Sequence, residues 1–388
     1  GDAGVLAGIK VIEIGGLGPA PFCAMMLADH GAEVLRVERL GKVHTEGAEV
    51  QDDLVGWDIM SRGRLSAGID LKHELGRDLV RRLSLDADVF IEGFRPGVAE
   101  RLGIGPDDLR RDHERLVYGR MTGWGRSGPL ADRAGHDLNY ISVSGALAHI
   151  GRVGQAPTPP LNLVGDFGGG GMFLAYGMVC AILSAKLGGT GQVVDAAMVD
   201  GSATLMSMIW AFKGMGIWDS DAPGTNLLDT GAHFYDTYRC ADGRWVSIGS
   251  IEPQFYAELL RYTGLEGEEL PSQMDKTQWG SMKEKLAEIF ATKTRDEWSA
   301  IMEGTDVCFA PVLSMDEATR HPHNVQRGTF IELNGVTQPA PAPRFSATPG
   351  GVQRPPAHAG QHTDEVLSEW LGLDDAGIAA LRESGTVA

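Results

Sequence analysis

The stretch IKVIEIGGLGPAPFCAMMLADHGAEVLRVE, residues 9–38, decides the fold class of this chain. Residues 9–14 are a short apolar run typical of a buried strand, and a turn rich in glycine and proline follows at 15–21. Residues 22–29 have the composition of a helix, and 33–38 form a second strand. Two strands joined by a helix are the repeating unit of an α/β protein with a parallel sheet.

The same alternation of strand and helix continues through the first two hundred residues. Further strands are predicted at 67–71, 88–92, 116–121 and 192–197, and further helices at 74–85, 172–187 and 203–215. Strands of five or six residues separated by helices favour a parallel, doubly wound sheet. The helices 172–187 and 203–215 are apolar all round, which predicts burial in a core or at a subunit interface.

The sequence changes in character after Gly216, and this change predicts a second, smaller α/β domain. Two strand-like runs, 233–240 and 245–249, flank an Asp-Gly turn, the pattern of a β-hairpin. Residues 219–229 are polar and contain Pro223 and Gly224, as in a linker, and the proline-rich 338–356 predicts an extended arm. We therefore divide the chain into a large Rossmann-like domain (1–200), a linker helix and linker (201–229), a small α/β domain (230–320), and a return segment with C-terminal helices that packs on the large domain (321–388).

The composition is that of an acidic globular chain. Its 388 residues carry 34 Lys and Arg against 52 Asp and Glu, a formal net charge of −18, so no basic surplus exists to bind nucleic acid or an acidic membrane. The four scattered cysteines lack metal-ligand spacing, which predicts reduced thiols, no metal site and a cytoplasmic location. The most apolar run, 172–185, contains Tyr176 and Gly177, so no membrane span is predicted.

Two polar islands carry the candidate chemistry. They are GHDLNY at 135–140 and NLVGDF at 162–167, the second followed directly by four glycines. A histidine (His136) and a separate carboxylate (Asp166) beside turn-forming residues suit chemistry that needs two bases, or a base and a nucleophile. Each island alone also fits a structural role, with Asp137 capping a helix, His136 in a core and Asp166 in a glycine turn.

Basic residues stand beside the ends of successive predicted strands. A cluster of cations at one sheet edge favours a phosphate-rich ligand, although each residue alone also fits a solvated loop. These residues are Arg39, Arg62, Arg64, Lys72, Arg95 and Arg101. A dinucleotide site is a further candidate, because Gly16 and Gly18 follow a strand and Glu38 ends the next, but Pro21 takes the place of the third glycine of that fingerprint.

Longer segments around these residues resemble the family III coenzyme A transferases over nearly the whole chain. These are GIKVIE (8–13), GP (18–19), GAEVLRVE (31–38), RGRLS (62–66), DLK (70–72), DVFIEGFRPG (88–97) and GWG (123–125). Within that superfamily, four segments are similar to the alpha-methylacyl-CoA racemase branch: GHDLNY (135–140), LVGDFGGG (163–170), IEPQFY (251–256) and PAPRF (341–345).

The resemblance implies an interlocked homodimer of two-domain protomers, in which domains of different protomers meet at the active site. It implies an acyl-CoA substrate, no cofactor, and interconversion of 2R- and 2S-methylacyl thioesters through an enolate. His136 and Asp166 then serve opposite faces of the alpha carbon, and Asp137 and Glu252 support them, either being able to fix the imidazole tautomer. The family positions for coenzyme A in the large domain correspond to Leu17, Arg39, Leu71, Lys72, Gly93, Arg101 and Tyr140.

Two other functions compete with this one. In a coenzyme A transferase the position of Asp166 is a nucleophile that forms a mixed anhydride and an enzyme thioester; His136 favours the racemase, because a transferase does not require a base there. A non-catalytic coenzyme A sensor needs only the cations, so the presence of His136, Asp166 and Glu252 argues against it. The acyl group stays open, and the methionines Met198, Met206, Met208 and Met215 fit either an adaptable acyl surface or a core.

Overall fold

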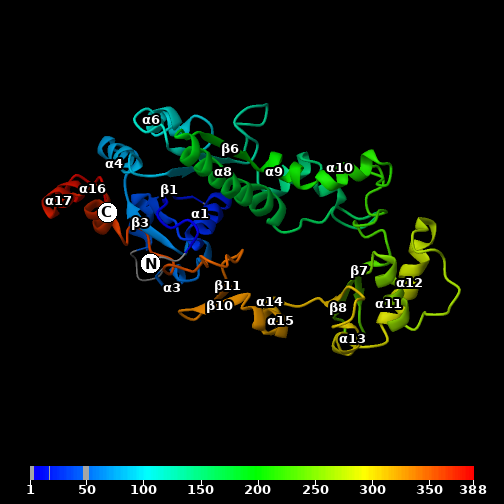
Figure 1. Ribbon diagram of the computed structural model, residues 1–388. Coiled ribbons are helices and arrows are strands. Elements are labelled where there is room, and N and C mark those ends of the chain that lie inside the picture. The colour runs from blue at the N-terminus through cyan, green and yellow to red at the C-terminus, as the bar shows by residue number, and fades with distance from the viewer. Residues whose placement is uncertain (1–3, 17, 47–51) are drawn as a thin grey trace. The chain divides into compact units, whose positions relative to one another are not determined.

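The computed structural model describes residues 4–16, 18–46 and 52–388 (Figure 1). The chain forms two compact units: a large unit of the residues up to Ser144, Leu161–Leu205 and Arg327–Ala388, and a small unit of Gly145–Pro160 and Met206–Gln326. The division drawn from the sequence differs from this one in four places. It assigned 145–160 to the large domain, 206–229 to a linker and 321–326 to the return segment, and all three belong to the small unit; residues 201–205, also assigned to the linker, belong to the large unit.

In the described part of the large unit, six parallel strands form one sheet in the order β3-β2-β1-β4-β5-β6. Their bounds are β1 Lys10–Ile14, β2 Glu33–Glu38, β3 Arg64–Gly68, β4 Val89–Glu92, β5 Val117–Thr122 and β6 Val193–Ala197. The order reverses between β1 and β4, so the connections leaving these neighbouring strands diverge and open a crevice at their carboxyl ends. The predicted doubly wound α/β architecture is confirmed.

Helices cover both faces of this sheet because the strands alternate their side chains between two cores. Val11 and Val89 face a core shared with α1 (Pro19–Asp29) and α8 (Met172–Gly188). Ile12 and Phe90 face the other core, shared with α4, α16 and α17. The remaining elements of the large unit are α2 Leu40–Glu46, α3 Asp52–Val55, η1 Ile59–Ser61, α4 Glu74–Ser84, α5 Val98–Arg101, α6 Pro106–Arg110, α7 Asp137–Val143, η3 Leu163–Gly171, α9 Met198–Leu205, β10 Phe330–Leu333, β11 Val336–Pro339, α16 Thr363–Leu371 and α17 Asp375–Glu383.

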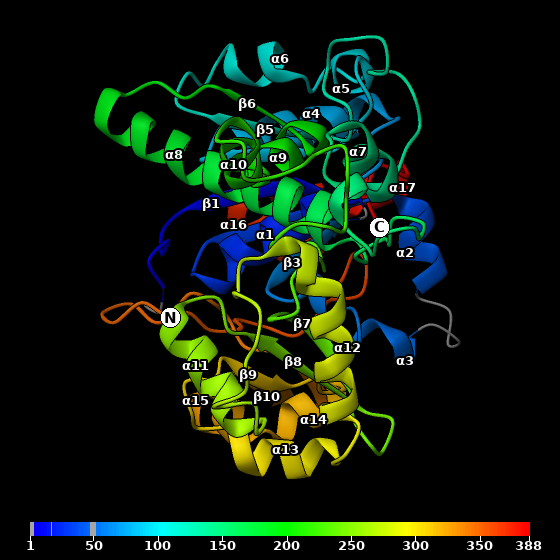
Figure 2. The ribbon, with the colours of Figure 1, turned by 90° about the vertical axis from the view of Figure 1, so that its right-hand side faces the viewer.

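In the small unit, β7, β8 and β9 form a three-stranded antiparallel sheet surrounded by α11, α12 and α13 (Figure 2). The predicted hairpin is present, with Tyr235 paired to Gly249 and Arg239 to Trp245. The predicted linker 219–229 is an ordered loop, in which the buried Asn226 donates to the carboxylate of Asp229. The bounds in this unit are η2 Leu147–His149, α10 Ser207–Gly214, β7 Tyr235–Arg239, β8 Trp245–Gly249, α11 Pro253–Tyr262, η4 Lys276–Gln278, α12 Trp279–Phe290, α13 Arg295–Met302, β9 Phe309–Pro311, α14 Met315–Arg320 and α15 Pro322–Arg327.

One long helical stretch differs from its prediction. Leu163–Gly171 is a π-helix that continues directly into α8, whereas the sequence predicted a glycine turn there. The continuous stretch Leu163–Gly188 therefore reaches 26 residues and is long and apolar enough, by length and composition alone, to cross a membrane. These properties alone do not establish a span, since one face of α8 packs on β5 and β6 as a core helix of the sheet.

A buried ionic cluster joins the first three strands. Glu13 on β1 is fully buried and accepts hydrogen bonds from Arg36 on β2 and Arg64 on β3, each through its Nε at 3.0 Å. Burial opposes ionisation of Glu13, but the two guanidinium groups outweigh it and hold its pKa below the ordinary value. Strand β3 begins at Arg64, whereas the apolar pattern of the sequence predicted a start at residue 67. The buried strand can include Arg64 because Glu13 neutralises its charge.

We expect Glu13→Gln to destabilise the protein by about 3–5 kcal/mol, because the buried Arg64 loses its ion-pair partner and Arg36 keeps the more distant Glu38, at 3.8 Å. Urea unfolding at pH 7 measures this loss, with the exposed Glu114→Gln as a control that should change stability by less than about 0.5 kcal/mol. A carboxylate whose pKa is lowered on folding stabilises the protein above its unfolded pKa, and this contribution disappears as the pH falls through the folded pKa. The difference between wild type and Glu13→Gln should therefore shrink below about pH 4; a difference independent of pH would contradict this assignment.

Candidate active site

His136 stands immediately before α7, on a loop that Tyr140 holds in place. The Tyr140 hydroxyl donates a 2.6 Å hydrogen bond to the carbonyl of Gly135, and its ring packs edge-on against Trp124. The backbone amide of His136 donates to Asn139 Oδ1 at 3.0 Å, which closes the first turn of the helix. These hydrogen bonds fix the backbone around His136. The imidazole itself is solvent-exposed, so the ring can reach a ligand.

Asp166 lies in the first turn of the π-helix, and Asp137 anchors its backbone. Asp137 Oδ2 accepts hydrogen bonds from the amides of Gly165, at 2.8 Å, and Asp166, at 2.6 Å. A Cβ at position 165 would stand 2.7 Å from the Asp137 carboxylate, so only glycine allows this approach. Since Asp137 directly follows His136 in the chain, one buried carboxylate joins the segments that carry the two candidate bases.

The electrostatic environment makes Asp166 a stronger base than an ordinary carboxylate. Its partial burial raises its pKa, and the nearby negative charge of Asp137 acts in the same direction. A hydrogen bond from Asn162 and the electrostatic influence of His136 oppose this effect, but the net shift is upward. A carboxyl group with a raised pKa is better matched to returning a proton near neutral pH.

The four glycines after Phe167 serve packing, which the predicted turn does not explain. A Cβ at Gly169 would stand 2.7 Å from the backbone nitrogen of Ser202 on α9, and one at Gly171 would stand 2.7 Å from the ring of Phe22 on α1. The glycines therefore let the π-helix lie directly against the backbones of its neighbours. A π-helix is an uncommon conformation that is frequently found at functional sites.

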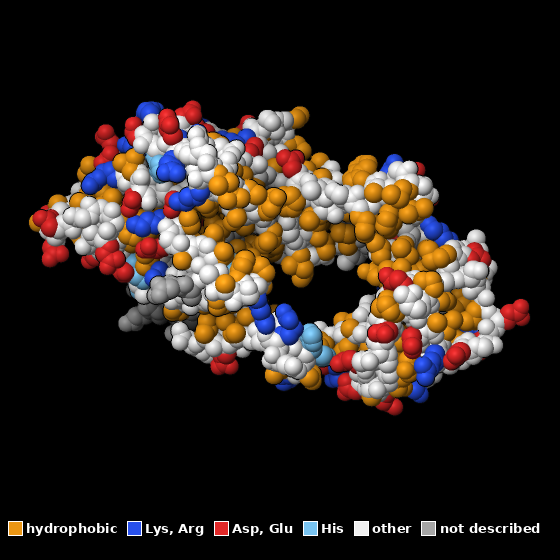
Figure 3. Space-filling model, viewed as in Figure 1, with side chains coloured by type: hydrophobic (Ala, Val, Ile, Leu, Met, Phe, Trp, Pro, Cys, Tyr) orange, Lys and Arg blue, Asp and Glu red, His pale blue; other side chains and the backbone are white. Residues whose placement is uncertain are grey.

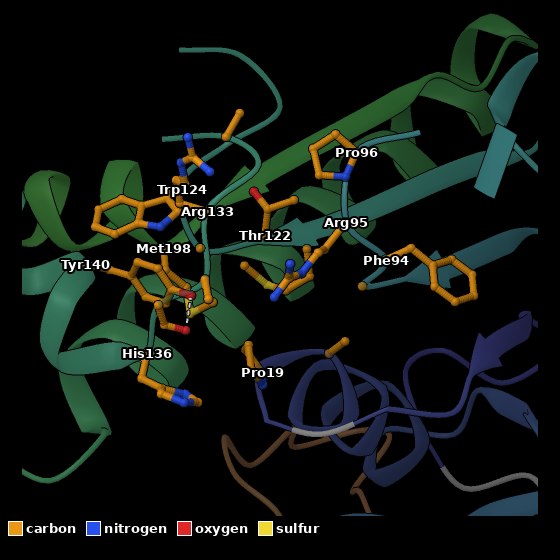
Figure 4. A pocket seen from close by; sticks show the side chains of 17 residues that line it. Pro19, Phe94, Arg95, Pro96, Thr122, Trp124, Arg133, His136, Tyr140 and Met198 are labelled. Carbon is orange, nitrogen blue, oxygen red and sulfur yellow. Dashed lines mark hydrogen bonds between the residues drawn. The ribbon is translucent and has the colours of Figure 1, made fainter. Parts of the chain in front are cut away.

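A cavity of about 310 Å³ opens beside His136 (Figure 4). Gly93 and Arg95, from the loop after β4, line it together with Tyr140 and Met198. Its walls combine apolar side chains with the exposed guanidinium of Arg95 and the imidazole of His136. Of the residues predicted from the resemblance, His136, Gly93 and Tyr140 thus share one cavity.

A second cavity, of about 1010 Å³, lies at the carboxyl ends of β1, β2 and β3. Arg39, Leu71 and Lys72, three of the positions that the resemblance assigns to coenzyme A, line it, and Phe94 lines both this cavity and the one beside His136. Arg101 lines neither cavity and lies with its guanidinium near Gly97 on the turn before α5. Leu17 lies outside the described residues.

Two of the six cations assigned to the strand ends are structural. Arg62 is 2% exposed and pairs with Asp29 at 2.7 Å, while its Nη1 donates to Gln338 Oε1 at 2.9 Å. Arg64 is 1% exposed and belongs to the Glu13 cluster. Because both guanidinium groups are enclosed and neutralised, neither is available to a phosphate, and their assignment to a ligand was wrong.

Glu252 belongs to the small unit, at the N-cap of α11. It is exposed and lies near Cys308. Burial is the main cause of the raised pKa of the Cys308 thiol, and the negative charge of Glu252 adds to it. The role of Glu252 beside the two bases stays a prediction. Within the described residues, no group of three or more His, Cys, Asp or Glu side chains is arranged to hold a metal ion.

A family model described as CoA-transferase family III matches residues 6–363. The chain belongs to this family. It is 47% identical to the mouse alpha-methylacyl-CoA racemase and 45% identical to the human one, in each case over 94% of this chain and 93% of the relative. The crystal structure of Rv3272 from Mycobacterium tuberculosis has 26% sequence identity and a TM-score of 0.77, and the match covers 94% of this chain and 99% of that one.

We expect Asp137→Ala to destabilise the protein by about 2–4 kcal/mol, because two buried backbone amides lose a charged acceptor. Asp137→Asn keeps an oxygen acceptor and should cost less. Urea unfolding measures both, with Asp132→Ala, an exposed aspartate in the preceding loop, as the control. If Asp137→Ala proved as stable as this control, Asp137 would not be the anchor of the π-helix.

Proposed function

We propose that this protein is an alpha-methylacyl-CoA racemase, which interconverts 2R- and 2S-methylacyl-CoA thioesters. The observation that carries the proposal is the junction at Asp137, which joins a histidine and a carboxylate of raised pKa within one unit. Relatives with 45–47% identity over nearly the full chain carry the same name. Both lines of support favour racemisation over transfer of coenzyme A between carboxylates.

The reaction needs two proton-transfer groups on opposite faces of the alpha carbon. One base removes the alpha proton, the electron pair moves into the thioester carbonyl to give an enolate, and the conjugate acid of the other base returns a proton to the opposite face. In this assignment His136 serves one face and Asp166 the other. Asp137 Oδ2 accepts hydrogen bonds from the amides of Gly165 and Asp166, whereas Oδ1 has no hydrogen-bond partner among the described residues, so the role of Asp137 in fixing the imidazole tautomer stays a prediction.

Coenzyme A is assigned to the two cavities of the large unit. Arg39 and Lys72 supply positive charge in the larger cavity, which suits the phosphorylated nucleotide. Phe94 lines both cavities, so an extended thioester passing this residue would bring its acyl end to His136. Tyr140 contributes its ring to this path, while its hydroxyl is engaged by the Gly135 carbonyl.

The homodimer is also part of this proposal. Met172, Tyr176, Val179, Leu183 and Leu187 recur at helical spacing on the exposed side of α8, where hydrophobic side chains gather (Figure 3). A soluble protein rarely leaves such a stripe uncovered. A second copy of the chain would bury it and provide the interface that the interlocked arrangement requires.

The exchange of the alpha proton tests the function. With a 2-methylacyl-CoA in heavy water, the enzyme alone should introduce deuterium at the alpha carbon of both enantiomers, without any acceptor acid. Nuclear magnetic resonance of the recovered thioester measures this exchange. Turnover that appears only after a second free carboxylate is added would establish the transferase instead.

Single variants separate the two bases in the same assay. His136→Ala and Asp166→Ala should each slow racemisation by about a hundred- to ten-thousandfold, the usual effect of losing a proton-transfer group. From the family resemblance, the His136 variant should lose exchange with the 2S thioester and the Asp166 variant with the 2R thioester. Loss of the same enantiomer in both variants would contradict the two-base assignment.

Arg39→Ala should raise KM about ten- to a hundredfold, because a charge-assisted contact to a phosphate is lost while the chemical step is untouched. Arg111→Ala is the matched control, since its exposed side chain lies outside both cavities. Added salt should weaken substrate binding by the wild type more than by Arg39→Ala. Equal KM values in the two variants would place the nucleotide elsewhere.

A further inference from the structure

The side chain of Asn162 contacts the proposed base Asp166 directly. Asn162 is the N-cap residue of the π-helix, a position where asparagine usually bonds a backbone amide of the first turn. Here it caps no amide. Its Nδ2 donates to Asp166 Oδ2 at 3.2 Å instead. A residue placed for helix capping is thus used to hold a carboxylate.

This contact supplies what the Asp137 anchor does not. Asp137 fixes the backbone of Asp166, but it leaves the carboxyl group free to rotate about the side-chain bonds. No other hydrogen bond to the Asp166 carboxyl occurs within the described residues. The amide of Asn162 occupies Oδ2, so Oδ1 is the oxygen left to exchange a proton with a substrate.

The backbone before Asn162 is strained in a way that supports the same role. Leu161 has a φ of 57°, in the left-handed region that residues other than glycine rarely adopt. Its side chain is 77% exposed, so packing of that side chain does not compensate for the strain. Strain of this kind is retained most often at functional sites. In this chain the strained residue directly precedes Asn162.

We propose that Asn162 is a positioning residue for Asp166, which fixes the orientation of its carboxylate and favours the charged form that accepts the alpha proton. This inference rests on the racemase function proposed above. It adds a residue that acts through Asp166 and need not touch the substrate.

The other groups around Asp166 determine the sign of the effect. The charged or titratable side chains that influence it are Asp137, His136 and Tyr140, the last from the same helix as Asp137. Burial and Asp137 raise the pKa of Asp166, whereas the Asn162 hydrogen bond lowers it. Removing the amide donor should therefore raise this pKa further, and a carboxylate at position 162 should raise it more.

The test compares Asn162→Ala, the isosteric Asn162→Asp and wild type in the exchange assay from pH 4 to 9. The Asp166→Ala variant identifies the enantiomer that Asp166 deprotonates. For this enantiomer, the acidic limb of the plot of exchange rate against pH should move up by about one pH unit in Asn162→Ala and further in Asn162→Asp. At pH values below this limb, a shift of one pH unit corresponds to an exchange rate that is about tenfold lower. Exchange of the other enantiomer should keep its pH profile, and KM should stay within about twofold of wild type.

Asn324→Ala is the matched control, since Asn324 also donates a single side-chain hydrogen bond, to the carbonyl of Ala318, but in the small unit. Its profiles should equal those of wild type. The inference is overturned if Asn162→Ala slows both enantiomers equally, or if neither Asn162 variant moves the limb while wild type exchanges normally. Absence of exchange in wild type would instead refute the proposed function. Because Asn162→Asp preserves shape, it decides the question even if Asn162→Ala folds poorly.

Discussion

The ion cluster around Glu13 is the constraint on which the large unit depends. It places one carboxylate at the centre of the sheet and requires β2 to present Arg36 level with Glu13, and β3 to present Arg64 from two residues earlier in the register, level with Val34. A register shift by one residue would turn these arginines to the opposite face and leave buried charges unpaired. The cluster thus fixes the positions of three strands, and with them the carboxyl ends at which Arg39 and Lys72 line a cavity.

The candidate catalytic segment obeys a second constraint, the approach of backbone to backbone. A π-helix with glycine at 165 and at 168–171 lies against α1, α7 and α9, at distances that no side chain at Gly165 or Gly169 would allow. This close packing brings the amides of residues 165 and 166 to the carboxylate of Asp137. The close packing of this candidate segment thus comes from glycine, usually the most flexible residue.

Much of this architecture was predictable from the sequence, because hydrophobic periodicity reports burial. Strands β1, β2, β4, β5 and β6 and the 235–249 hairpin have apolar or β-rich patterns, and their predictions agree with the structure within about two residues. The start of β3 and the roles of Arg62 and Arg64 were missed for one reason. A buried arginine has the same sequence appearance as a solvated one until its partner, Asp29 or Glu13, is located in three dimensions. The π-helix was missed because consecutive glycines predict a turn, and the contacts that favour a helix lie in distant segments.

The candidate site illustrates how a sequence can suggest reacting groups without giving their arrangement. His136 and Asp166 are separated by thirty residues, and the resemblance to a family assigned them roles without a physical link between them. Asp137 supplies that link. Its side chain accepts hydrogen bonds from the amides of residues 165 and 166, and its backbone directly follows His136. A single carboxylate therefore links the two segments by hydrogen bonds. For the proposed reaction, which must remove and return a proton at the same carbon, Asp137 ties together the backbones that carry both proposed bases, while the orientation of each side chain has to be set separately.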